Sequence, residues 1–94
     1  MSSPTIAMKD ASVARGGLDH VSGSNFIPGR TICYYVAGQF SCAVPSGPYG
    51  TQAYGAANKQ LPIPSGIPAA AGTPVAAIDN TDPTDKATTT VTTT

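Results

Sequence analysis

The chain has 94 residues, which is enough for one small domain, and it carries no net charge because five basic residues balance five acidic ones. The basic residues are scattered rather than clustered, which argues against a nucleic-acid partner. Leucine, isoleucine, valine and phenylalanine together number 16, so the expected core is small, and we expect folding to need a partner surface, oligomerisation or a disulfide. The sequence offers no apolar run of about 18 residues for a membrane span and no signal-peptide pattern, so we expect a soluble product of a cytoplasm.

The residue types favour strands. Glutamate and tryptophan are absent, leucine occurs twice, and 12 threonines, six valines and six isoleucines favour extended backbone. Nine prolines and ten glycines interrupt every stretch long enough for a helix. We therefore predict a single all-β domain over residues 1–94, built of short strands and hairpins with an extended Pro/Gly-rich arm and little or no helix.

The N-terminal third is predicted to be mostly loop. Pro4–Lys9 indicates a short strand with Ile6 and Met8 on one face. The polar, glycine-rich segment Ala11–Arg30 is expected to be a loop, with one short strand at Asn25–Ile27.

Thr31–Val44 has the pattern of a two-stranded hairpin. Its β-branched and aromatic residues flank Ala37 and Gly38, and a glycine in the bend can reach positive φ. If these two residues form the loop, Cys33 and Cys42 face each other at a non-hydrogen-bonded position, where side chains approach most closely. Four residues then share one face of the hairpin: Cys33, Tyr35, Phe40 and Cys42.

The state of the two cysteines stays open at this point. A reducing cytoplasm keeps thiols free, whereas an oxidising environment after release allows a Cys33–Cys42 disulfide. A three-residue loop with a bulge would place the cysteines diagonally and strain a bridge.

Residues 45–74 are interpreted as an extended arm because they contain six prolines and five glycines. The two prolines around Ile63 favour a polyproline-like segment whose apolar side chains lack a partner nearby in the chain. We expect the arm to bind a partner, and the predicted contact residues are Tyr49, Tyr54, Leu61, Ile63 and Ile67.

The C-terminal residues predict a second hairpin. Val75–Ile78 and Ala87–Thr94 are expected to be strands joined by a turn over Asp79–Lys86. The turn holds the one carboxylate cluster of the sequence, Asp79, Asp82 and Asp85. Its spacing does not match a helix-loop-helix calcium loop, and the simpler interpretation is that these side chains cap their own backbone; calcium remains an alternative.

Catalytic chemistry is not indicated. His20 and one of the two cysteines could form a dyad, but a third orienting group and a cleft have no counterpart in the sequence. A structural zinc site needs four ligands, and the two cysteines and His20 supply three. We predict a non-enzymatic protein without a metal or other cofactor.

Two segments resemble the small head-decoration, or capsid cement, proteins of tailed bacteriophages. Tyr35 to Phe40 with the following Pro45 resembles their aromatic strand, glycine turn and aromatic strand before a proline. Pro74–Thr94 resembles their small-residue strand, Asp-rich turn and threonine-rich strand, although the two segments occur here in the opposite order.

The resemblance implies a structural protein of a virion that binds the major capsid protein or other virion subunits on the capsid surface. It would be made in the host cytoplasm and form a homo-oligomer on the shell, with no nucleic acid or membrane bound. The composition of the chain agrees, because free strand edges and an apolar arm gain most by lying across other subunits. Two alternatives stay open: another virion part such as a spike, neck or tail protein, and a secreted or surface-anchored adhesion module, which oxidised cysteines would favour.

Overall fold

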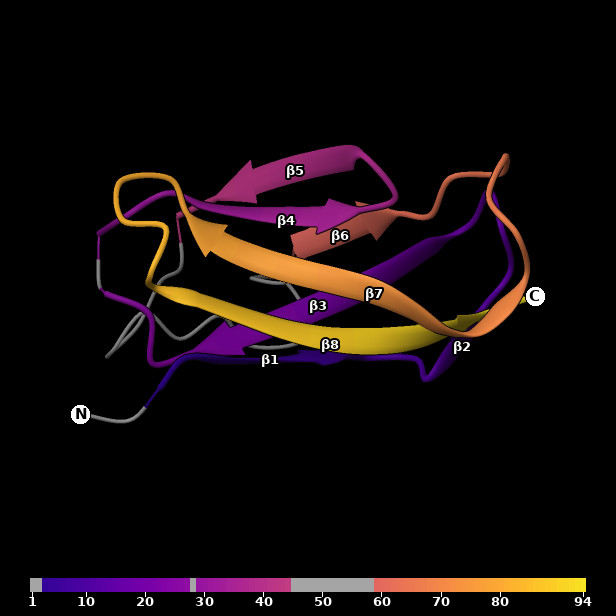
Figure 1. Cartoon of the computed structure of the whole chain (residues 1–94), viewed down its shortest axis with the longest axis horizontal. Helices are drawn as coiled ribbons and strands as arrows, with labels where there is room; N and C mark the ends of the chain where they lie inside the picture. The colour runs from indigo at the N-terminus through magenta and orange to yellow at the C-terminus, as the bar shows by residue number, and fades with distance from the viewer. Residues whose placement is uncertain (1–2, 28, 45–58) are drawn as a thin grey trace.

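The computed structural model describes residues 3–27, 29–44 and 59–94, and within these ranges it contains eight strands and no helix (Figure 1). The predicted all-β class is therefore confirmed. The strands are β1 (Thr5–Met8), β2 (Ser12–Val13), β3 (Leu18–Ser24), β4 (Ile32–Val36), β5 (Gln39–Ala43), β6 (Lys59–Pro62), β7 (Ala70–Asp79) and β8 (Lys86–Thr93).

The strands form two sheets packed face to face. The smaller sheet has the order β1-β3-β6, and the larger has the order β2-β8-β7-β4-β5. All neighbouring strands are antiparallel except β2 and β8, which are parallel. The two sheets also contact each other near their edges, where β1 lies near β8 and β5 lies near β6.

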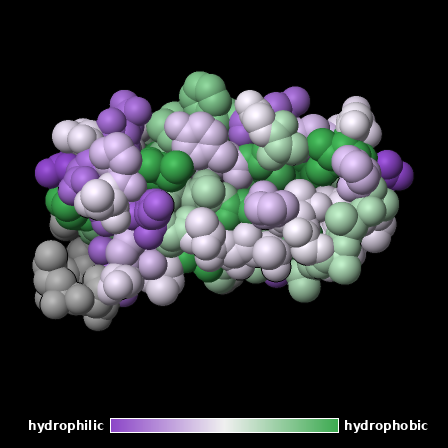
Figure 2. Space-filling model, in the orientation of Figure 1, coloured by the Kyte–Doolittle hydropathy of each residue, from purple (hydrophilic) through white to green (hydrophobic). Residues whose placement is uncertain are grey.

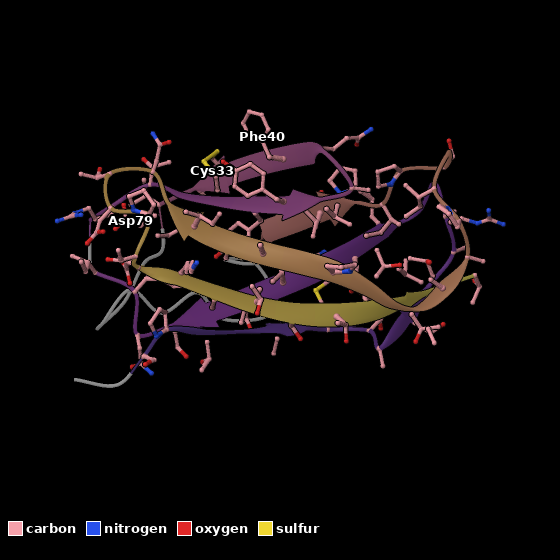
Figure 3. The ribbon with its side chains drawn as sticks, in the orientation of Figure 1. Cys33, Phe40 and Asp79 are labelled. Carbon is pink, nitrogen blue, oxygen red and sulfur yellow. A yellow bond between two sulfur atoms is a disulfide. The ribbon has the colours of Figure 1, made fainter. Side chains whose placement is uncertain are left out.

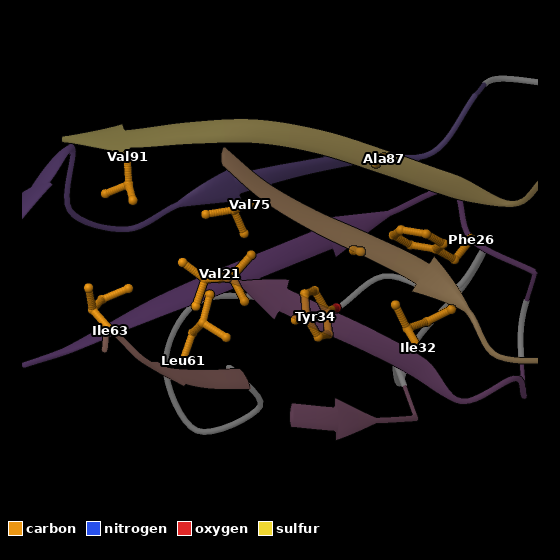
Figure 4. Packing of buried hydrophobic residues seen from close by; sticks show 11 residues of the cluster. Val21, Phe26, Ile32, Tyr34, Leu61, Ile63, Val75, Ala87 and Val91 are labelled. Carbon is orange, nitrogen blue, oxygen red and sulfur yellow. The ribbon is translucent and has the colours of Figure 1, made fainter. Parts of the chain in front are cut away.

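The core lies between the sheets and is made by this chain alone (Figure 4). Side chains from both sheets interdigitate there, which is the arrangement expected for a two-sheet sandwich. Eleven buried residues of this chain form the core, and alanine fills two of its positions. The cluster consists of Val21, Phe26, Ile32, Tyr34, Val36, Leu61, Ile63, Val75, Ala77, Ala87 and Val91.

The prediction of a loop over Ala11–Arg30 is wrong. This segment contains β2 and the central strand β3, whereas the short strand predicted at Asn25–Ile27 does not form. Every second residue of β3 faces the core. These residues are Asp19, Val21 and Gly23, so only one of them is a large apolar residue. The apolar alternation that normally reveals a strand is therefore missing from the sequence.

Gly23 is required for packing. A Cβ at this position would lie 2.9 Å from Phe26 Cε2 and 3.2 Å from Tyr34 Oη, and both of those side chains are fully buried. We expect Gly23→Ala to lower the free energy of unfolding by about 2 kcal/mol, because rings in a filled core cannot move aside freely. Urea denaturation would measure this loss. The control is Gly66→Ala, where the added Cβ meets nothing within 4 Å, and equal stability of the two variants would contradict the argument.

The prediction of an extended arm over residues 45–74 is wrong for residues 59–74. Residues 59–62 form β6, and Leu61 and Ile63 are buried in the core. The backbone of Ile63 is held on both sides, since its N–H donates to Gly17 O and its carbonyl accepts from Gly16 N. Pro62 fits because β6 is an edge strand, and a strand edge does not need the missing N–H. Residues 45–58 lie outside the described part of the chain.

The remaining predicted strands are found, with changed ends. Pro4–Lys9 becomes β1, and its Ile6 and Met8 pack against the core as expected. The strand predicted at Val75–Ile78 is the second half of the longer β7, which begins inside the presumed arm. β7 pairs with β8 as the predicted C-terminal hairpin, with a register shift between Ala70 and Thr73.

Candidate functional site

The outer face of the larger sheet is the broadest surface that the strands define. Cross-strand pairing aligns Phe40, Tyr35, Ala76 and Thr88 in one row across β5, β4, β7 and β8. Neighbouring strands are about 4.8 Å apart, so this row is about 14 Å long. Lys86 is the one charged side chain among the outward positions of these four strands, which are Cys33, Tyr35, Phe40, Cys42, Pro74, Ala76, Ile78, Lys86, Thr88, Thr90 and Thr92.

The β4–β5 hairpin has the predicted register. Cys33 pairs with Cys42 and the two cysteines form a disulfide, with Cα atoms 4.1 Å apart as expected at a non-hydrogen-bonded position. The turn residues Ala37 and Gly38 have φ values of 47° and 83°, both in the left-handed region. This is the type I′ geometry that suits a two-residue hairpin loop. The structure therefore contains the bridge that this register allows.

Ala37 is a poor residue for its backbone conformation. The left-handed region is unfavourable for most residues with a Cβ, including alanine, whereas asparagine tolerates it better. We expect Ala37→Asn to raise the free energy of unfolding by about 1 kcal/mol, because Asn-Gly is the preferred pair for this turn. Thermal denaturation would show a higher midpoint. The matched control, Ala37→Val, should destabilise the protein, and a gain in that variant would rule out turn strain as the cause.

A cluster of apolar side chains projects from this hairpin. Phe40 is 64% exposed and Val44, directly after β5, is 58% exposed. The rings of Tyr35 and Phe40 are 5.5 Å apart and tilted by 34°, so the two aromatic residues form one contact. Figure 3 shows Phe40 projecting from the edge of the sheet near the Cys33 disulfide. We call Tyr35, Phe40, Val44 and the Cys33–Cys42 disulfide the aromatic patch.

The strongly hydrophilic residues lie mostly toward the two ends of this face, and its middle is pale or green (Figure 2). One end holds a polar network centred on the buried carboxylate of Asp79 (Figure 3). Asp79 Oδ1 accepts hydrogen bonds from Thr81 N and Asp82 N at 2.7 and 3.2 Å, and its Oδ2 lies 3.3 Å from Arg30 Nη1. Asp85 Oδ2 accepts from Ile27 N at 3.1 Å, which ties the loop after β3 to the β7–β8 turn.

The carboxyls of Asp79 and Asp85 are neighbours with opposite pKa shifts. Burial alone would raise the pKa of Asp79, but the N–H groups of Thr81 and Asp82, a hydrogen bond from Asp85 and the charge of Arg30 together hold it below its usual range. Burial and the nearby Asp79 carboxylate raise the pKa of Asp85, although its hydrogen bond from Ile27 N opposes the shift.

This network supports the capping interpretation of the Asp79–Lys86 turn. Asp79 caps the N–H groups two and three residues later, and Asp82 Oδ1 accepts from Thr84 N and Oγ1 at 3.1 and 2.7 Å. No group of three or more histidine, cysteine or acidic side chains among the described residues is arranged to hold a metal ion. The turn is therefore accounted for as a stabilised chain reversal.

Asp19 is a buried group that sequence reasoning missed. Its side chain is fully buried, and its Oδ1 accepts from Asp10 N and His20 N at 3.1 and 2.7 Å. These bonds hold the segment that leaves β1 for β2. Its Oδ2 has no hydrogen-bond partner in the described part of the chain.

The structure separates the five predicted contact residues. Leu61 and Ile63 are 1% and 2% exposed, so they pack in the core. The prediction that these two residues contact a partner is therefore wrong. Ile67 is half-buried and lines a shallow apolar depression of about 260 Å³ together with Ala37, Pro68, Ala70, Gly72, Thr73 and Pro74. Tyr49 and Tyr54 lie outside the described residues.

A cysteine–histidine dyad does not form. Both cysteines are in the disulfide, and His20 lies on β3 in the other sheet rather than in a loop. Within residues 3–27, 29–44 and 59–94, no helix is long and apolar enough to cross a membrane.

Comparison with known proteins adds no relative, since no family model, curated protein or solved structure matches this chain.

Proposed function

We propose that this protein is a non-enzymatic structural protein of a virion that decorates or cements a bacteriophage capsid by binding across its shell subunits. The observation that carries the proposal is the broad outer face of the larger sheet, which has one charged side chain, Lys86, and lies between ends where the strongly hydrophilic residues gather. A face with few charged side chains and with exposed apolar residues such as Phe40 suits binding to another protein. The resemblance of the hairpin and the C-terminal strands to head-decoration proteins supports the same role.

The size of the protein sets the upper limit for this face. The long and middle extents of the molecule are 35 and 26 Å, so one whole side covers about 900 Å² at most. Each partner in a standard protein–protein interface buries about 800 Å². One copy could therefore bind a shell subunit through this face, and copies at neighbouring subunits would together strengthen the shell.

Co-sedimentation with empty shells tests the proposal. The shells would be assembled from the major capsid protein encoded in the same genome, and we expect saturable binding and a higher melting temperature of the shell. Deleting 45–74 is not a suitable variant, because β6 and part of β7 would be lost. If the folded protein stays in the supernatant at every concentration, the decoration role is rejected.

A secreted or surface-anchored adhesion module is the second candidate, and the disulfide is the observation that favours it. Disulfides persist in oxidising surroundings outside the cytoplasm, although a released virion meets the same surroundings. Mass spectrometry separates the two roles. Decoration requires the protein in purified particles, whereas adhesion requires it in the envelope or secreted fraction of cells that contain no particles.

A further inference from the structure

We propose that the aromatic patch is the anchor by which this protein docks on an uncharged, apolar area of the shell protein. This inference rests on the proposed function and names the part of the surface that would carry most of the binding energy. A few well-placed aromatic residues usually dominate an interface, while the surrounding contacts mainly exclude water.

Exposure distinguishes the patch from the rest of the outer face. Phe40 and Val44 are the most exposed large apolar side chains of the described residues, at 64% and 58%. The other large apolar residues of the face, Tyr35 and Ile78, are partly covered by their neighbours. Farther along the row, Ala76 and Thr88 are small and offer little area to bury. Docking therefore gains most where Phe40 and Val44 lose their contact with water.

The patch is also held in place before binding. The disulfide joins the two strands of the hairpin, the two-residue turn fixes their register, and the Tyr35 ring supports the Phe40 ring at 5.5 Å. A side chain that is already ordered loses less conformational entropy when it binds. The hairpin can thus present Phe40 at a low entropic cost.

The charge of the patch specifies its partner. The patch itself contains no Asp, Lys or Arg side chain, and the charged residue on the same face, Lys86, lies across β7 on β8. Charged groups of a partner would lose their contact with water against the patch and would find no opposite charge there to compensate for that loss. The fitting occupant is therefore an uncharged, apolar area of the shell protein, and binding should be nearly independent of salt because no ion pairs are formed at the anchor.

Two matched variants test the anchor with purified protein and empty shells. Phe40→Ser removes the exposed ring of the patch, and Leu18→Ser removes a side chain that is 53% exposed on the opposite sheet. We expect Phe40→Ser to weaken shell binding at least about tenfold and Leu18→Ser to leave it unchanged. Wild-type binding should change less than about threefold between about 0.05 and 0.5 M NaCl. Near-ultraviolet circular dichroism and thiol titration would establish that both variants are folded and oxidised.

The possible failures are distinguishable. Equal binding by both serine variants overturns the anchor while the decoration role stands, and a steep salt dependence overturns the uncharged partner. If wild-type protein self-associates in sedimentation experiments and Phe40→Ser does not, the patch joins two copies of the chain and the shell is not its occupant. If wild-type protein does not bind shells at all, the proposed function fails together with the anchor.

Discussion

Replacing both Cys33 and Cys42 with alanine is expected to lower the free energy of unfolding by about 2 to 3 kcal/mol. The disulfide closes a loop between residues nine positions apart, and a closed loop of this size restricts the unfolded chain by about that amount. The effect is large for this protein because its core contains few large side chains and two alanines. Guanidinium denaturation of the wild type and the double variant would measure the difference.

Chemical reduction provides the control for this prediction. Wild-type protein in dithiothreitol should unfold at the same denaturant concentration as the double alanine variant, and the variant itself should not respond to the reductant. A wild-type midpoint that reduction leaves unchanged would contradict a stabilising role of the bridge. A reduced protein that remains folded but binds shells more weakly would connect the disulfide to the order of the aromatic patch.

The hairpin was predictable because its signals are local. Ala37 and Gly38 lie between two runs of β-branched and aromatic residues, and the two-residue loop alone determines which residues face each other. The Cys33–Cys42 pair follows by counting outward from the turn, and the structure has that pairing. The turn at Asp79–Lys86 was predictable for a similar reason, since Asx side chains bond to N–H groups two and three residues later.

The central strand of the smaller sheet, β3, was not predictable because it carries unusual residues at core positions. In β3, Asp19 and Gly23 take positions where a pattern search expects large apolar side chains. Gly23 is explained by Phe26, three residues later in the chain, and by Tyr34 from β4, which occupy the space above it. Such a glycine looks like a loop residue until its neighbours in space are known.

β6 is absent from the sequence prediction because Pro62 and Pro64 favour a polyproline-like arm. The alternation of Leu61 and Ile63 with Pro62 is a strand pattern, and proline is compatible with a strand at the edge of a sheet. This error moved two core residues into the predicted contact set. The sequence predicts that Tyr35 and Phe40 share one face of the hairpin. Their rings are in contact there, and Phe40 is the exposed ring of the aromatic patch.

Replacing Asp79 with alanine is expected to lower the free energy of unfolding at neutral pH by about 3 kcal/mol. The substitution leaves the N–H groups of Thr81 and Asp82 without their acceptor and removes the partner of Arg30. The pKa of Asp79 is lowered in the folded protein, so the stabilisation it gives is present above its usual pKa of about 4 and is lost as the pH falls through the folded value. The deficit of the variant should therefore shrink in acid, as urea denaturation at a series of pH values would show.

Asp85→Asn should have the opposite effect, which makes it the matched variant. The pKa of Asp85 is raised in the folded protein, so its contribution to stability is present below its usual pKa of about 4 and is lost as the pH rises through the folded value. An amide at this position stays neutral, can accept from Ile27 N and can donate to the Asp79 carboxylate. We expect the variant to be more stable than the wild type at pH 7 and equally stable below about pH 4. A variant that is less stable than the wild type at pH 7 would mean that the Asp85 carboxylate, rather than the repulsion between two acids, determines the stability of this end of the sandwich.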